Sequence, residues 1–298
     1  MPRPCTLHKV QKGDNALSRA GFPALFSQFN LAGNGPQPIS GIRGKALDIA
    51  FVASNAPDAQ TALQRLQEKY SHVIPSKADT IVALGGDGFM LATQHKFMNS
   101  GKPVYGMNKG TVGFLMNEYS ERGLKRRLEK AIRNTIRPLM MEATDINGEI
   151  FVRPAINEVS LLRQSFQAAS LRITIDGKVR LDSLVGDGIL VATPAGSTAY
   201  NLSAHGPILP LDAPLLALTP ISPFRPRRWR GALIPDSAVV EIDIRDPAKR
   251  PVNAVADHYE VKSVKKVKVS VDQESKGYIL FDPEHSWDER ILAEQFQY

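Results

Sequence analysis

The 298-residue sequence contains a single cysteine, Cys5, and this scarcity limits the chemistry open to the chain. A disulfide framework needs paired cysteines and a cysteine-based zinc site needs several, so both are excluded. A reducing cytoplasm is the compartment we expect. No apolar run approaches the ~18 residues of a membrane-spanning helix, and the N-terminus lacks the pattern of a signal peptide. We therefore predict no contact with a membrane.

Lysine and arginine outnumber aspartate and glutamate by 37 to 30, which gives a formal net charge of +7. The excess gathers in a helical-looking run from Arg122 to Arg137, in the loop 225–230 and in the strand-like segment 262–268. None of them carries a helix-turn-helix, zinc knuckle or aromatic stacking pattern, so we predict no nucleic-acid partner. Solvated faces explain the first and third stretches, whereas the arginine loop suits a polyanion such as a nucleotide triphosphate.

Frequent glycine and proline interrupt any periodic spacing of apolar residues in the first 45 residues. We therefore predict that residues 1–45 form a poorly ordered extension. Gly44-Lys45 looks superficially like part of a P-loop. The motif is absent, however, because Ala46 replaces its Ser or Thr and Ile39 occupies the place of its first glycine.

Residues 46–138 alternate short apolar runs with helical patterns. Strands are predicted at 47–52, 81–84 and 103–107, each followed by a helix, and the third helix opens near Ser120. This alternation is typical of an α/β domain with parallel strands, right-handed crossovers and a ligand at the carboxyl ends of the strands.

Residues 139–282 change to a β-rich pattern. Asp176-Gly177, between two alternating segments, predicts a two-residue hairpin, and helix is plausible only around 197–204. Residues 284–297 look helical again. We expect the segment 283–298 to pack back on the first domain, with Ile291, Leu292 and Phe296 available for docking.

The turn Gly85-Gly86-Asp87-Gly88 separates the buried-strand pattern at 81–84 from an apolar, helix-compatible segment. Backbone N–H groups at such a strand–glycine–helix junction can approach a phosphate closely. A carboxylate beside phosphates implies a metal ion or a proton to remove. An ordinary turn, whose glycines only supply positive φ, remains the alternative.

Two further polar stretches stand out. In Asn157-Glu158 an amide and a carboxylate at a strand end can share the hydrogen bonds of a sugar and a base edge, although a surface turn also explains them. The segment 193–203 continues a strand into a Thr-Pro-Ala-Gly turn, and Ser197 is placed to cap a helix rich in hydroxyls. An ordinary proline-glycine turn is the alternative, but Asp187, between two glycines just upstream, favours a polar cradle.

Taken in order, these motifs resemble the NAD kinase family from about Leu47 to the C-terminus. The motifs are Gly85-Gly86-Asp87-Gly88, Gly106-Met107-Asn108 with Gly113-Phe114-Leu115, Asn157-Glu158, Asp187-Gly188, Thr193-Pro194-Ala195-Gly196-Ser197-Thr198-Ala199-Tyr200 and Leu218-Thr219-Pro220-Ile221. The glycine–aspartate turn is shared with phosphofructokinases and diacylglycerol-type lipid kinases. The Thr-Pro-x-Gly-Ser-Thr-Ala-Tyr stretch is specific to NAD kinases.

The resemblance implies a Rossmann-like N-terminal α/β domain, a β-rich C-terminal domain that binds NAD, and an active site in the cleft between them. The implied reaction is ATP-dependent phosphorylation of NAD on the 2′-hydroxyl of its adenosine ribose, giving NADP. It also implies Mg²⁺ or another divalent cation with the phosphate donor, and a homo-oligomer, either dimer or tetramer, in which some sites borrow residues from a neighbouring subunit.

Site residues follow from the same resemblance. Asp87 corresponds to the family's proton acceptor, with Gly85, Gly86 and Gly88 around the donor phosphates. Asn157 and Glu158 correspond to contacts with the adenosine end of NAD. Further dinucleotide contacts are expected at Asp187, Thr198, Ala199, Tyr200, Asn201, Leu202 and Ser203.

The sequence departs from the family pattern at three places. Phe89 follows the glycine turn where threonine is frequent, Ala195 replaces a common threonine, and Asp272-Gln273-Glu274 stands where many members have Asp-Gly-Gln. These changes leave the donor open between ATP and inorganic polyphosphate. A lipid or sugar kinase built on the shared turn, and a dinucleotide-binding regulator without activity, are the alternative functions.

Overall fold

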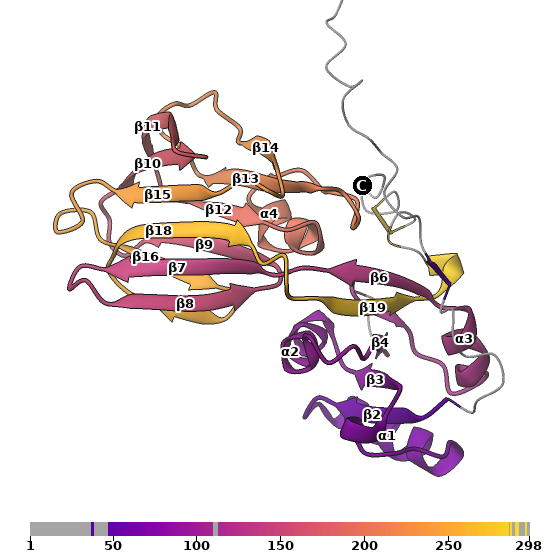
Figure 1. The fold of residues 1–298 in the computed structure, drawn as a ribbon. Coiled ribbons are helices and arrows are strands. Elements are labelled where there is room, and N and C mark those ends of the chain that lie inside the picture. The colour runs from indigo at the N-terminus through magenta and orange to yellow at the C-terminus, as the bar shows by residue number, and fades with distance from the viewer. Residues whose placement is uncertain are drawn as a thin grey trace, which may run out of the picture. The chain divides into compact units, whose positions relative to one another are not determined.

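The computed structural model describes residues 37–38, 47–109, 113–285, 287, 290, 291 and 296 (Figure 1). The predicted extension 1–45 lies outside the described residues except for Gln37–Pro38. These two residues form strand β1, which pairs antiparallel with β6 (Ile132–Ile136). The pairing corrects the prediction of a poorly ordered segment at these two positions.

A seven-stranded sheet organises the first region, with the path β1-β6-β19-β4-β3-β2 and with β5 beside β4. Its remaining strands are β2 (Ile49–Ala53), β3 (Thr80–Leu84), β4 (Val104–Asn108), β5 (Asn117–Glu118) and β19 (Gly277–Phe281). β2, β3 and β4 are parallel neighbours, so their carboxyl ends meet at one edge. The glycine turn follows β3 at that edge.

Helices cover both faces of this sheet. The helices are α1 (Pro57–Lys69), the 3₁₀ helix η1 (Pro75–Lys77), α2 (Asp87–Phe97) and α3 (Leu124–Lys130). Val82 and Leu84 of β3 share a hydrophobic cluster with Leu66 of α1, whereas Ile81 shares another with Met90 of α2. Successive strand residues point to opposite faces, so α1 and α2 cover opposite sides. The predicted strands and the first two helices are confirmed.

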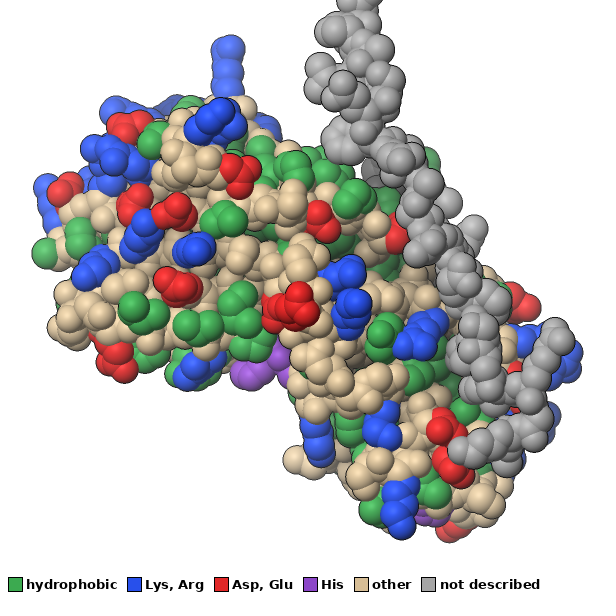
Figure 2. All heavy atoms as spheres, in the orientation of Figure 1, with side chains coloured by type: hydrophobic (Ala, Val, Ile, Leu, Met, Phe, Trp, Pro, Cys, Tyr) green, Lys and Arg blue, Asp and Glu red, His purple; other side chains and the backbone are tan. Residues whose placement is uncertain are grey.

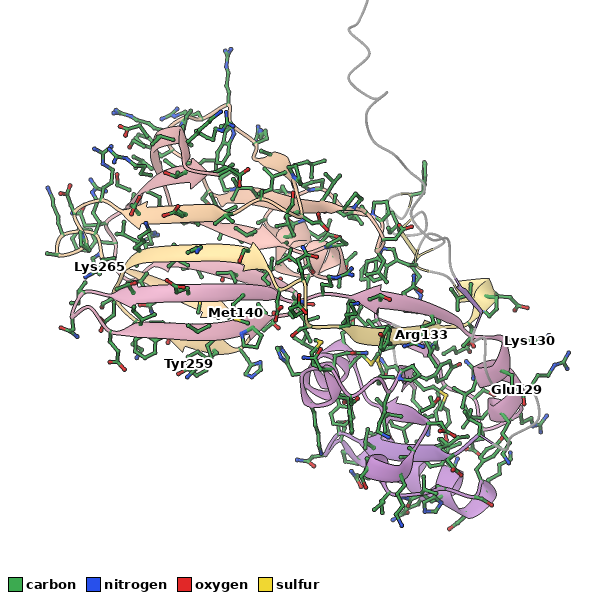
Figure 3. All side chains as sticks on the ribbon, viewed as in Figure 1. Glu129, Lys130, Arg133, Met140, Tyr259 and Lys265 are labelled. Atoms are coloured by element: carbon green, nitrogen blue, oxygen red, sulfur yellow. The ribbon has the colours of Figure 1, made fainter. Side chains whose placement is uncertain are left out.

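Two segments differ from the sequence-based prediction. The helical run expected up to Arg137 ends at Lys130, and Ile132–Ile136 forms β6 because its β-branched residues pair with β19. Glu129 and Lys130 project away from α3 (Figure 3). Gly277–Phe281, assigned above to the β-rich region, lies in the first sheet between β6 and β4. A short apolar run shows that a strand is buried but not which sheet receives it.

Two six-stranded antiparallel sheets build the second region, with the orders β11-β10-β15-β18-β7-β8 and β14-β13-β12-β9-β16-β17. Their strands are β7 (Leu139–Asp145), β8 (Ile150–Ala155), β9 (Glu158–Arg163), β10 (Ala169–Ile175), β11 (Lys178–Gly186), β12 (Gly188–Ala192), β13 (Leu215–Ile221), β14 (Ala232–Pro235), β15 (Val240–Ile244), β16 (Val252–Ala256), β17 (Tyr259–Val261) and β18 (Val264–Val271). Leu161 and Val191 of one sheet share a buried cluster with Ile242 and Val267 of the other. The sheets therefore pack face to face, and the predicted β-rich region is confirmed.

The hairpin and the basic strand of this region also match their predictions. Asp176 and Gly177 join β10 to β11 with φ of 50° and 72°, as a type I′ turn requires. Lys266 pairs with Glu241 on the neighbouring strand, and exposed Lys265 is labelled in Figure 3. Basic and acidic side chains are interspersed over this surface (Figure 2), which is therefore a solvated face.

Two described residues near the C-terminus pack against the first sheet. After β19 and the 3₁₀ helix η3 (Pro283–His285), Trp287 and Ile291 are buried in the cluster that contains Ile81 and Met90. Phe296 is 75% exposed, so the docking expected of it is wrong, and Leu292 lies outside the described residues. In the described part of the chain, no helix has the length and apolarity needed to cross a membrane.

Gly188→Ala tests the packing of the β12 strand. A Cβ at this position would lie 1.9 Å from the Leu161 carbonyl oxygen of β9, so the two strands would have to separate. We expect a loss of about 1–3 kcal/mol in the free energy of unfolding, measured by urea denaturation. Gly88→Ala is the matched control, because a Cβ there meets no atom within 4 Å. Equal stability of both variants would contradict the packing argument.

Candidate active site

Asp87 occupies the first turn of α2, immediately after the glycine turn. Its two carboxylate oxygens accept hydrogen bonds from the backbone N–H groups of Phe114, at 3.0 Å, and Leu115, at 3.1 Å. Gly113 allows this approach, because a Cβ on it would lie 2.3 Å from the carboxylate. The side chain is therefore held by backbone groups, and its orientation depends on the loop 113–115.

Opposing effects set the charge of Asp87. Burial raises the pKa of its carboxyl above the ordinary value, while the N–H groups of Leu115 and Phe114 and the positive charge of Arg290 act to lower it. The net result is a raised pKa. A partly desolvated carboxylate of this kind is a better proton acceptor than one in water, because its basicity is closer to neutral pH.

Open space adjoins the glycine turn. Added Cβ atoms on Gly86 and Gly88 would meet nothing within 4 Å, so packing does not require glycine at either position. A cavity of about 240 Å³ adjoins Gly85 and Gly86. Its other lining residues include Ser54, Asp58, Asn108, Lys109 and Tyr119. The turn thus offers bare backbone at a helix N-terminus, where phosphate oxygens bind well.

The Asn157-Glu158 turn is held by a buried carboxylate, Asp257. One oxygen of Asp257 accepts the N–H of Ile156 at 2.7 Å, and the other accepts the N–H groups of Asn157 and Glu158 at 2.9 and 3.3 Å. The Nε2 of His95, on α2, lies 2.7 Å from the first oxygen. The Asp257 side chain is 0% exposed. It therefore links the helix that begins at Asp87 to the turn that carries Asn157 and Glu158.

Asn157 and Glu158 carry buried polar atoms without a protein partner. The atoms are Asn157 Oδ1 and Glu158 Oε2, and no hydrogen bond reaches either of them among the described residues. Burial and then the negative charge of Asp257 raise the pKa of Glu158 to about 7, against the lowering effect of the Tyr200 N–H. Unpaired buried acceptors are costly and rare in folded proteins. These two are suited to a ligand that donates hydrogen bonds.

The Thr-Pro-Ala-Gly turn packs directly on Asn157. Thr193 donates its hydroxyl to the Ile156 carbonyl at 2.7 Å and its N–H to the Asn157 carbonyl at 2.9 Å. A Cβ on Gly196 would lie 2.1 Å from that same Asn157 oxygen, so only glycine fits. Ser197, expected as a helix cap, is instead buried and bonded to Pro194 and Leu209. The two predicted polar stretches are therefore parts of one structure.

The segment 198–203 divides into exposed and structural residues. The 3₁₀ helix η2 (Ala195–Thr198) leads into the short helix α4 (Tyr200–Ser203). Asn201 is buried, and its side chain bonds to the carbonyls of Ser197 and Pro207 and to the Thr219 hydroxyl. It supports the turn from inside. Thr198, Ala199, Tyr200 and Leu202 are partly exposed and Ser203 is exposed, so these remain accessible to a ligand.

Asp187 lies one strand length from Glu158. It immediately precedes Gly188, the first residue of β12, whereas Glu158 pairs with Ala192 at the opposite end of this strand. Its carboxylate lies 2.6 Å from the Arg163 Nε and is 40% exposed. Burial raises the pKa of the Tyr200 phenol, and the charges of Glu158 and Asp187 add to that effect. Tyr200 is therefore electrostatically coupled to both carboxylates.

Three residues that support the site were not predicted from the sequence. Gly113 belongs to the Gly113-Phe114-Leu115 motif named above, but nothing in the local sequence indicates its contact with Asp87. His95 and Asp257 are 162 positions apart in the chain, so no local pattern could join them. The Asp272-Gln273-Glu274 segment, compared above with a family motif, forms a turn in which Asp272 accepts the N–H groups of Glu274 and Ser275.

Comparisons with known proteins identify the family of this chain. The chain matches the family model of the ATP-NAD kinase N-terminal domain over residues 42–136 and that of the C-terminal domain over residues 156–280. The NAD kinase of Rhizobium meliloti (strain 1021) is 62% identical over 248 residues, which are 83% of this chain and 96% of the relative. That of Mesorhizobium japonicum is 59% identical over 85% of this chain and 98% of the relative.

Solved structures show the same fold. Yeast NADH kinase complexed with NADH aligns with a TM-score of 0.65 and 25% identity, over 82% of this chain and 76% of the yeast chain. The NAD kinase of Archaeoglobus fulgidus in complex with ATP aligns with a TM-score of 0.64 and 21% identity, over 83% and 99% of the two chains. The matches decide against a lipid or sugar kinase and against a regulator without activity. The chain belongs to the NAD kinase family, whose enzymes phosphorylate NAD to NADP.

Proposed function

We propose that Asp87 accepts the proton of the NAD 2′-hydroxyl while the donor phosphates lie over the glycine turn. The observation that carries this proposal is the Asp87 carboxylate, held by two backbone N–H groups at a helix N-terminus beside the open space of Gly86 and Gly88. Phosphoryl transfer to a hydroxyl depends mainly on positioning and on stabilising charge. A raised pKa for Asp87 suits it to take up the proton as the hydroxyl attacks.

We assign the adenosine end of NAD to the Asn157-Glu158 turn. Its unpartnered Oδ1 and Oε2 atoms would accept hydrogen bonds from the base edge and from ribose hydroxyls. The cradle would be completed by five accessible residues, Thr198, Ala199, Tyr200, Leu202 and Ser203. Asn201 would support it from inside. Asp187 contributes a further contact through its position near Tyr200. The active site would then lie between the α/β region and the β-sandwich.

ATP is the phosphate donor we propose, with polyphosphate as the alternative. Among the described residues, no group of three or more histidine, cysteine or acidic side chains is placed to hold a metal ion. The phosphate oxygens themselves bind Mg²⁺ well, so we propose that a divalent cation enters with the donor. The cation would neutralise charge on the transferring phosphate. An NADH-bound relative makes NADH a second acceptor to test beside NAD.

The resemblance predicts the assembly, and the single cysteine predicts the location. We propose a homo-oligomer, a dimer or a tetramer, and a cytoplasmic location in which the single cysteine stays reduced. Size-exclusion chromatography with light scattering would establish the number of subunits.

Asp87→Asn tests the proton acceptor. We expect kcat for NADP formation to fall by about 10²–10⁴-fold, because an amide cannot accept the proton. The measurement is NADP production with ATP and with polyphosphate. Asp79→Asn is the control: Asp79 also accepts a backbone N–H, from Asp48 at 3.1 Å, but lies outside the site. Near-normal turnover by folded Asp87→Asn enzyme would refute the proposed role.

Gly88→Ala tests the donor site. At this helical position alanine should not destabilise the fold and could add about 0.5–1 kcal/mol to the free energy of unfolding. The new methyl group would enter the space assigned to phosphate, so KM for the donor should rise while KM for NAD changes less. Steady-state kinetics with each substrate varied separate the two effects. An unchanged donor KM would place the phosphates elsewhere.

Glu158→Gln tests the acceptor site and has a defined pH dependence. Because the folded-state pKa of Glu158 is raised to about 7, folding binds a proton between about pH 5 and 7, and wild-type stability falls as pH rises through this window. Glutamine removes that loss, so the variant should gain thermal stability relative to wild type at pH 8 but not at pH 5. Its KM for NAD should rise by about tenfold or more. A pH-independent stability difference would contradict the raised pKa.

A further inference from the structure

Arg290 lies outside every motif in the sequence and yet contacts the loop that holds Asp87. Its Nη1 donates to the carbonyl oxygens of Gly113, at 2.8 Å, Phe114, at 3.1 Å, and Met116. Its Nη2 lies 3.5 Å from the Asn117 Oδ1. One guanidinium therefore gathers successive peptide groups of the segment 113–117. Nη1 faces the carbonyls while Nη2 faces Asn117, and a lysine, with one side-chain nitrogen, cannot reproduce this two-nitrogen arrangement.

The gathered peptide groups are the ones that hold the Asp87 carboxylate. Gly113 and Phe114 present their carbonyls to Arg290, while Phe114 and Leu115 present their N–H groups to Asp87. The loop thus lies between a partly buried cation and a partly buried carboxylate. Gly113 packs closely on the carboxylate, because an added Cβ would lie 2.3 Å from it. Movement of this loop would move Asp87.

Packing fixes Arg290 from behind. Trp287, Arg290 and Ile291 have helical conformation and the i, i+3, i+4 spacing of one helix face. Trp287 and Ile291 are buried, and the Trp287 Nε1 donates to the Leu209 carbonyl at 3.1 Å. The guanidinium itself lies 5.1 Å from the ring centroid of Phe281. Asp87, Asp282 and Tyr105 act to raise the pKa of the guanidinium, whereas burial has the larger effect and lowers it.

We propose that Arg290 is a positioning residue for phosphoryl transfer, which clamps the loop 113–116 so that the Asp87 carboxylate stays aimed at the acceptor hydroxyl. The C-terminal segment is then part of the active site. This inference rests on the proposed role of Asp87. Arg290 also places a positive charge near Asp87, which opposes the effect of burial on the carboxylate. The orientation of the loop and the positive charge near Asp87 can be tested separately. Arg290→Lys keeps the positive charge but loses the contacts that orient the loop.

The test compares Arg290→Gln with Arg290→Lys in the full-length enzyme. Misplacement of a reacting group by ~1 Å lowers rates by about 10²-fold, so kcat should fall by about this factor in Arg290→Gln while KM for NAD and ATP stays within about twofold. Loss of the cation raises the Asp87 pKa, so the acidic limb of its kcat–pH profile should move to higher pH. Arg290→Lys should show the lowered kcat with a nearly unshifted pH profile.

Added guanidinium ion provides a second readout. In Arg290→Ala the ion can occupy the vacated position, so millimolar guanidinium chloride should restore part of kcat while equal sodium chloride should not. Arg245→Gln serves as the control, since Arg245 pairs with exposed Asp182 on the β-sandwich. Its kcat and pH profile should match wild type. Thermal melts of every variant identify any loss of activity that comes from unfolding, and Arg290→Lys is the variant used if Arg290→Gln unfolds.

The outcomes separate this inference from the proposed function. Wild-type kcat and pH profile in folded Arg290→Gln, with inactive Asp87→Asn, would overturn the role of Arg290 and leave Asp87 as proton acceptor. The same is true of a defect confined to KM. Activity in Asp87→Asn would instead overturn the proposed function. A lowered kcat with rescue by guanidinium, beside inactive Asp87→Asn, supports both.

Discussion

The buried carboxylate of Asp257 is the interaction on which the rest of the site depends. It gathers the N–H groups of Ile156, Asn157 and Glu158 and also contacts His95 of α2. Charge-assisted hydrogen bonds of this kind are strong because the acceptor is ionised and shielded from water. Through them the helix that begins at Asp87 is linked directly to the turn assigned to NAD, although the two belong to different regions of the fold.

Backbone groups, more than side chains, present the chemistry of this protein. Asp87 is oriented by two peptide N–H groups, Asn157 and Glu158 by a carboxylate that binds their peptides, and Gly196 by its contact with the Asn157 carbonyl. Peptide groups in packed loops have little freedom, so the site is organised before substrate arrives. The unpaired Asn157 Oδ1 and Glu158 Oε2 lower the free energy of unfolding, and this loss of stability is the cost of a preorganised site.

Much of the fold could be predicted from local patterns. The strands β2, β3 and β4, the helices α1 and α2 and the Asp176-Gly177 hairpin follow from apolar period and turn chemistry. The errors concern partners. Ile132–Ile136 is a strand because β19 lies beside it, and Gly277–Phe281 joins the first sheet after a long excursion through the sandwich. The local sequence of a strand does not indicate which distant strand it will pair with.

The candidate site divides in the same way. The sequence by itself determined where turns rich in glycine, proline and polar residues occur, at the glycine turn with Asp87, the Asn157-Glu158 pair and the Thr193–Tyr200 stretch, because such residues have direct local consequences. The roles predicted for them came from the resemblance to the NAD kinase family. Only the tertiary structure decided that Asn201 supports the turn from inside and that Asp187 lies one strand length from Glu158. It alone brought Gly113, His95, Asp257 and Arg290 to the site. Their contacts join positions far apart in the chain, and such contacts exist only once the sheets have packed.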